Sequence, residues 1–169
     1  MNTVVKEAIL LSVIFIISHS RGDSMNVLIV YKSYHKLNTE KIARAMAQAM
    51  DATVKKVEEA GPEDFSGCDL IGIGSGIYGG KYHKDLFKLI EKIPRLEKDA
   101  SVFSTAGKPD EKYDQPMKEL LTSKGCRIVG EFRCPGQTGF LGFTFTNKGH
   151  PDEHDLEKAR AFAKGLMAG

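Results

Sequence analysis

The chain has 169 residues, a length that suits one domain with a single hydrophobic core. Its 24 basic and 22 acidic side chains leave a formal net charge of +2, which is too small to indicate nucleic acid or an anionic membrane as the partner. The three cysteines have no spacing that predicts a disulfide framework or a metal site, so we expect a reducing, cytoplasmic setting.

The first 24 residues differ from the rest. Residues 8–17 are apolar except for Ser12, and this run is too short to span a bilayer as a helix but as long as the core of a signal peptide. We expect residues 1–24 to be a translated leader outside the domain, with Met25 as the natural start. A signal-like segment is the alternative, and no stable membrane insertion is expected. The domain is predicted over residues 25–169.

From residue 27 onward, continuous apolar runs alternate with segments of helical periodicity. Strands are expected over residues 27–31, 53–57, 70–74, 100–104 and 126–132. Helices are expected over residues 39–47, 83–93, 113–123 and from about Asp152 to the C-terminal end, with one helical turn over 62–65 and a long loop over 135–151. This alternation predicts an α/β fold with a doubly wound, five-stranded parallel sheet. Its ligand should bind at the carboxyl ends of the strands.

The segment after the first strand, residues 33–39, leads into a helix N-terminus. Unpaired backbone N–H groups and the positive end of the helix dipole make such a turn suitable for a phosphate. Ser33, Asn38 and Thr39 offer short hydrogen-bond donors, and His35 and Lys36 offer positive charge. Ser, Asn and Thr also favour plain helix capping, and taken alone the segment favours that interpretation.

Other phosphate-binding classes are excluded by their motifs. The sequence has no GxxxxGK[ST], so it is not a P-loop nucleotidase. A GxGxxG occurs at residues 74–79, after the third strand, but the next strand ends in Ser104 and Thr105 instead of the acidic residue that binds a ribose. These glycines suit close approach of the backbone to a flat ring, or plain turns. The acidic residues of a receiver domain are missing after the first and third strands.

Three loops of this sequence resemble those of the flavodoxin family. Residues 31–33 with 38–43 are similar to its phosphate loop, residues 74–81 to its second flavin loop and residues 103–107 to its third. The resemblance covers residues 25–169 and implies the sheet order 2-1-3-4-5 and FMN as the cofactor. The residues that it places at the cofactor are Ser33, His35, Lys36, Leu37, Asn38, Thr39, Ser75, Gly76, Ile77, Tyr78, Gly79, Ser104, Thr105, Ala106 and Gly107.

The chain departs from the family pattern at two loops. Leu37 stands in place of the usual glycine before Asn38, and the third loop lacks its usual aromatic residue. Tyr78, and after it Tyr113, are the candidates to stack on the flavin ring. His83 has a spacing similar to that of the flavodoxin-like protoporphyrinogen oxidases, but we favour a helix-capping or surface role for it.

These patterns predict an FMN-binding redox protein of the electron-transfer type. The alternatives are a two-electron FMN-dependent oxidoreductase, acting on a quinone or on protoporphyrinogen, and a flavin-free binding module of the same fold. The expected partner is a redox protein or a small-molecule electron donor or acceptor. Lys81 and Lys108 follow the second and third loops and would favour two-electron chemistry if either faced the ring, although for each of them a side chain pointing into water is the simpler interpretation.

Overall fold

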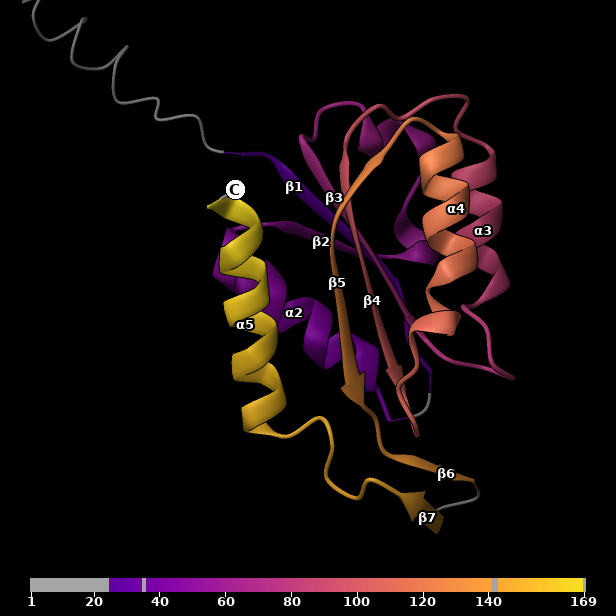
Figure 1. The fold of residues 1–169 in the computed structure, drawn as a ribbon, viewed down its shortest axis with the longest axis vertical. Coiled ribbons are helices and arrows are strands. Elements are labelled where there is room, and N and C mark those ends of the chain that lie inside the picture. The colour runs from indigo at the N-terminus through magenta and orange to yellow at the C-terminus, as the bar shows by residue number, and fades with distance from the viewer. Residues whose placement is uncertain (1–24, 35, 141–142, 169) are drawn as a thin grey trace, which may run out of the picture.

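In the computed structural model, the described residues are 25–34, 36–140 and 143–168, with side chains described outside 140–145. The expected leader, residues 1–24, and the candidate site residue His35 lie outside the described residues. Five parallel strands form the sheet in the order β2-β1-β3-β4-β5 (Figure 1). They are β1 (Val27–Lys32), β2 (Thr53–Lys56), β3 (Leu70–Gly76), β4 (Asp99–Ala106) and β5 (Arg127–Pro135). The predicted fold class and strand order are confirmed.

Helices cover both faces of the sheet (Figure 1). Helices α2 (Asn38–Met50) and α5 (Glu153–Met167) lie on one face, and α3 (Lys84–Glu91) and α4 (Gln115–Ser123) lie on the other. Alternate residues of β1 serve the two layers: Ile29 packs in the α2 and α5 cluster, and Val30 packs in the α3 and α4 cluster. This two-sided burial explains why β1 reads as a continuous apolar run.

Short elements complete the chain. Three 3-10 turns are η1 (Val57–Glu59), η2 (Pro62–Phe65) and η3 (Glu111–Tyr113). Strands β6 (Thr138–Phe140) and β7 (Phe143–Thr146) form an antiparallel pair below the ends of β4 and β5 in Figure 1. The prediction of a loop over 135–151 was wrong here, because strands of three and four residues lie at or below the shortest length at which alternation indicates a strand. Among the described residues, no helix has the length and apolar content to cross a membrane.

Strands β3 and β4 run further than the sequence indicated. Gly76 pairs with Thr105 in the parallel ladder, and Ser75 pairs with Ser104. The first residues of the expected second and third loops therefore belong to the sheet. This extension carries both loops to the same edge as the end of β1.

Candidate functional site

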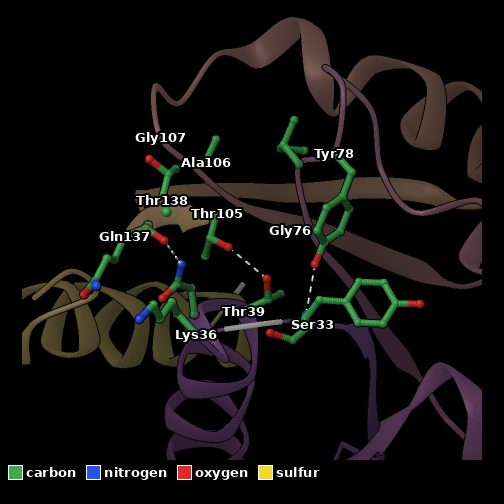
Figure 2. Close-up of a pocket in the computed structure, with 15 residues that line it drawn as sticks. Ser33, Lys36, Thr39, Gly76, Tyr78, Thr105, Ala106, Gly107, Gln137 and Thr138 are labelled. Atoms are coloured by element: carbon green, nitrogen blue, oxygen red, sulfur yellow. Dashed lines mark hydrogen bonds between the residues drawn. The ribbon is translucent and has the colours of Figure 1, made fainter. Parts of the chain in front are cut away.

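A cavity opens at the carboxyl ends of β1, β3 and β4, where the topology predicts a ligand. Four segments of the chain line it, within residues 33–39, 76–78, 105–107 and 136–139 (Figure 2). Ten of the fifteen predicted cofactor residues are in this lining: Ser33, Lys36, Asn38, Thr39, Gly76, Ile77, Tyr78, Thr105, Ala106 and Gly107. The structure thus brings the three predicted loops together around one space.

Four predicted residues do not line the cavity: Leu37, Ser75, Gly79 and Ser104. The Ser75 hydroxyl donates to the Gly76 carbonyl at 2.6 Å and accepts from the His83 N–H at 3.0 Å, so it holds the second loop to the start of α3. Ser104 is buried within β4. Sequence reasoning missed Tyr34, Gly136, Gln137, Thr138 and Gly139, which also line the cavity. Of these, Tyr34 lay inside the predicted first loop, whereas the other four belong to no motif.

The first turn of α2 opens onto the cavity without a side-chain cap. Leu37 is its N-cap residue, with a left-handed φ of 55°, and among the described residues no side-chain cap hydrogen bond is found at this helix start. In contrast, His83 accepts from the Asp85 N–H at α3, and Asp152 accepts from the Asp155 N–H at α5. The capping role favoured for His83 is therefore confirmed, and the capping interpretation of the first loop is wrong. The N–H groups at this helix start are available to an anion.

Short polar side chains tie the lining segments together. The Thr39 and Thr105 hydroxyl oxygens lie 2.8 Å apart in a buried pair (Figure 2). The Asn38 Nδ2 donates to the Gln137 carbonyl at 2.9 Å. The Asn38 Oδ1 is buried and has no hydrogen-bond partner among the described residues. Since a buried acceptor without a donor is costly, a ligand hydroxyl or water at this point would stabilise the site.

Tyr34 and Tyr78 line one side of the cavity, and the ring of His83, which is not part of the lining, packs against both. The Tyr78 hydroxyl accepts from the Tyr34 N–H at 3.0 Å, and the Tyr34 hydroxyl lies 3.3 Å from the His83 Nε2. The three rings meet edge to face, with centroids 5.2–5.9 Å apart. These contacts fix Tyr78, the first stacking candidate, in the lining, whereas Tyr113 lies outside it.

Comparison with known proteins identifies the family. A family model described as a flavodoxin domain matches residues 28–148. The chain belongs to the flavodoxin family. An uncharacterized protein of Methanocaldococcus jannaschii is 44% identical over 148 residues, which cover 85% of this chain and 99% of that protein.

Two solved structures share the fold of this flavodoxin-family protein. A flavodoxin from the domain Archaea superposes with a TM-score of 0.65 at 16% identity, covering 85% of this chain and 97% of that chain. A flavoprotein from Lactobacillus acidophilus NCFM in complex with FMN superposes with a TM-score of 0.54 at 20% identity, covering 64% and 93%.

Positive charge reaches the cavity of this flavodoxin-family protein through Lys36. Lys81 and Lys108 are exposed and neither lines the cavity, so the interpretation that they point into water holds for both.

Among the described residues, one group of possible metal ligands occurs, formed by His150, Asp152 and Asp155. Its two carboxylates cap α5 and its imidazole bonds Asp155 at 2.6 Å, so protein contacts already account for these groups.

Two histidines are expected to titrate on opposite sides of their usual value of 6.5. Burial lowers the pKa of His83, and the hydrogen bond to Asp155 raises the pKa of His150. The folded protein favours the neutral form of His83. The stability that this residue contributes is therefore complete above pH 6.5 and is lost as the pH falls from 6.5 through its folded-state pKa. Stability owed to His150 is complete below 6.5 and is lost as the pH rises through its folded-state pKa. Proton NMR titration checks both values, with His83→Gln and His150→Gln assigning the signals; the reverse order would contradict these environments.

Replacing Leu37 by glycine is expected to stabilise this protein by about 0.5–1 kcal/mol. A left-handed φ costs a residue other than glycine roughly 1–2 kcal/mol. Glycine avoids this cost, but part of the gain is offset because glycine loses more conformational freedom on folding. Leu37 is 46% exposed, so few packing contacts are lost. Urea unfolding measures the change. Leu37→Ala, which keeps the strain, is the control and should gain nothing; a destabilised Leu37→Gly would contradict the account.

Proposed function

We propose that this protein binds FMN in the cavity and carries electrons with it. The observation that carries the proposal is the uncapped first turn of α2, which opens onto a cavity enclosed by three loops of flavodoxin type. The FMN complex of the Lactobacillus flavoprotein, which shares the fold, supports the choice of cofactor. The three cysteines Cys68, Cys126 and Cys134 are free and buried, which suits a protein of the reducing cytoplasm.

The residues present fit both the phosphate and the ribityl chain of FMN. The first-turn N–H groups of α2, with Ser33 and Lys36, would hold the phosphate. The unsatisfied Oδ1 of Asn38 is an acceptor, so it suits a donor such as a ribityl hydroxyl rather than a phosphate oxygen. Tyr78 from the second loop and residues 105–107 from the third would flank the ring. When bound, FMN supplies the electron chemistry, while these residues bind it, orient it and shield it from water.

Titration of the flavin-free protein tests this proposal. FMN fluorescence should be quenched at micromolar protein, and heat-released cofactor should run with FMN on chromatography. Riboflavin, which has no phosphate, should bind at least tenfold more weakly, because it leaves the α2 N-terminus without an anion. Equal affinity for the two flavins, or no quenching by FMN, would contradict the proposed site.

Ser33→Ala is expected to weaken FMN binding roughly tenfold, the scale of one lost hydrogen bond to a charged group. Riboflavin binding should change little, because the expected partner of Ser33 is the phosphate. Fluorescence titration with both flavins measures the difference. Ser66→Ala, at the C-cap residue that follows η2 and outside the cavity lining, is the control. An equal loss for both flavins would assign Ser33 a structural role.

Transfer of single electrons is the mode that we propose. The two-electron alternative depended on a cation at the ring edge, and neither Lys81 nor Lys108 reaches the cavity lining. An anaerobic redox titration of the FMN-loaded protein should resolve two one-electron steps. One unresolved two-electron wave would favour the oxidoreductase instead.

A further inference from the structure

Five exposed lysines lie in the segments that line the cavity or directly beside residues that contact them. Lys36 is part of its lining, and the backbone N–H of Lys81 bonds the carbonyl of the lining residue Tyr78. Lys84 begins α3 beside His83, and Lys108 follows the lining residue Gly107. Lys148 follows Asn147, whose side chain donates to the carbonyls of Gly107 and Gly136. We call these five exposed residues the lysine rim: Lys36, Lys81, Lys84, Lys108 and Lys148.

The lysines of the rim form no direct ion pair with a carboxylate in the described part of the chain. Among the described residues, none of the five ammonium groups has a carboxylate oxygen within 4.0 Å, whereas Lys55 and Lys118 elsewhere are paired. The carboxylates next in sequence are engaged by other cations, Asp85 by Lys32 at 3.8 Å and Asp110 by Lys112 at 3.0 Å. The five lysines of the rim carry five positive charges, whereas the whole chain has a formal net charge of only +2.

Two large hydrophobic side chains are exposed in the same loop as Lys36 of the lysine rim. Tyr34 and Leu37 are the large hydrophobic side chains that stand out as exposed among the described residues, at 44% and 46%. Both belong to the first loop, beside the cavity. Exposed apolar groups bordered by charge mark protein interfaces. Among the described residues, Lys36 is the one lysine of the rim that lines the cavity, so the other four are available to a partner larger than the ligand of the cavity.

We propose that the lysine rim docks an acidic redox protein against the cavity. Complementary charge steers such transient partners together and speeds their association. With FMN bound, one electron would pass from the reduced centre of the partner to the oxidised flavin, or from the reduced flavin to the oxidised centre of the partner. The inference rests on the proposed function for the identity of the electron acceptor, but the docking surface can be tested without flavin.

The rate of electron transfer from a reduced, acidic ferredoxin is the first test. The variant Lys81→Gln/Lys84→Gln/Lys108→Gln should lower the second-order rate constant with the FMN-loaded protein at least tenfold at 20 mM salt, and should flatten its decrease toward 200 mM salt. The control Lys92→Gln/Lys158→Gln/Lys164→Gln makes the same charge change at exposed positions outside the rim and should stay within twofold. Neither variant should alter FMN affinity.

NMR mapping of docking on the flavin-free protein separates this inference from the proposed function. Addition of the oxidised acidic ferredoxin should shift amide signals around the lysine rim, and the rim variant should abolish these shifts. Equal effects of the two triple variants, or shifts located elsewhere, would overturn the proposal. Tighter binding of a short DNA duplex than of the ferredoxin at the rim would also overturn it, in favour of a nucleic-acid surface. Failure of FMN to bind would refute the proposed function and leave this docking result standing.

Discussion

Arg133→Met is expected to lower the free energy of unfolding by about 4 kcal/mol, the scale of leaving a buried carboxylate without its cation. Asp114 is fully buried, and its two carboxylate oxygens accept from the Tyr82 hydroxyl and from the Arg133 Nε. Methionine keeps much of the length and apolar contact of the arginine stem but removes the charge. Urea unfolding at neutral pH measures the loss.

An exposed ion pair in the same sheet gives the matched control. Arg127 donates to both carboxylate oxygens of Asp99 at 2.8 and 2.7 Å, but its side chain is 76% exposed. Water solvates both groups when such a pair is broken, so Arg127→Met should cost less than about 1 kcal/mol. A similar loss in the two variants would contradict the role of burial at Asp114.

The buried pair also bears on the candidate site. Tyr82 follows the second loop, and its hydroxyl lies 3.0 Å from the Phe103 carbonyl and 2.8 Å from Asp114. Asp114 ends the segment that continues the third loop, and Arg133 comes from β5. One buried cluster therefore joins the bases of two loops that enclose the cavity. We expect the Arg133 variant to bind FMN more weakly as well.

Local patterns predicted the parts of the site that follow directly from strands. Residues 33–39, 76–78 and 105–107 lie after three neighbouring parallel strands, so the topology alone brings them to one edge. The fourth segment reaches the cavity through contacts that no local pattern encodes. Asn38 bonds Gln137 across 99 positions, and Asn147 bonds Gly107 across 40.

Whether the residues of the first loop cap α2 depends on where their side chains point. Ser, Asn and Thr suit a helix cap and a ligand site equally well, so composition could not decide between them. In the folded chain the Thr39 hydroxyl bonds Thr105, and the Asn38 amide bonds Gln137. Both side chains therefore join different segments, and neither caps the start of α2. Similarly, the sequence marked Leu37 as unusual, but only the backbone shows its left-handed φ of 55°.

Gly74→Ala is expected to cost about 3 kcal/mol of stability, because the added methyl group has no room. A Cβ at Gly74 would lie 2.0 Å from the ring of Phe103 on the neighbouring strand, and that ring is 1% exposed. Relief requires the ring or the strand to move within a packed core, which is the origin of overpacking costs. Urea unfolding compared with the unchanged protein measures the effect.

Gly72 tests the same substitution two residues earlier, on the same face of β3. A Cβ there would lie 3.3 Å from Ile29 Cγ1 and 3.5 Å from Ser101 Oγ, contacts that a shift of a few tenths of an ångström relieves. Alanine also loses less backbone freedom than glycine when a strand forms, so Gly72→Ala should change stability by less than about 1 kcal/mol. A large loss at both positions would mean that neither glycine of this face of β3 has room for a methyl group. A large loss at Gly74 alone would show that the Phe103 ring requires glycine where β3 approaches the cavity.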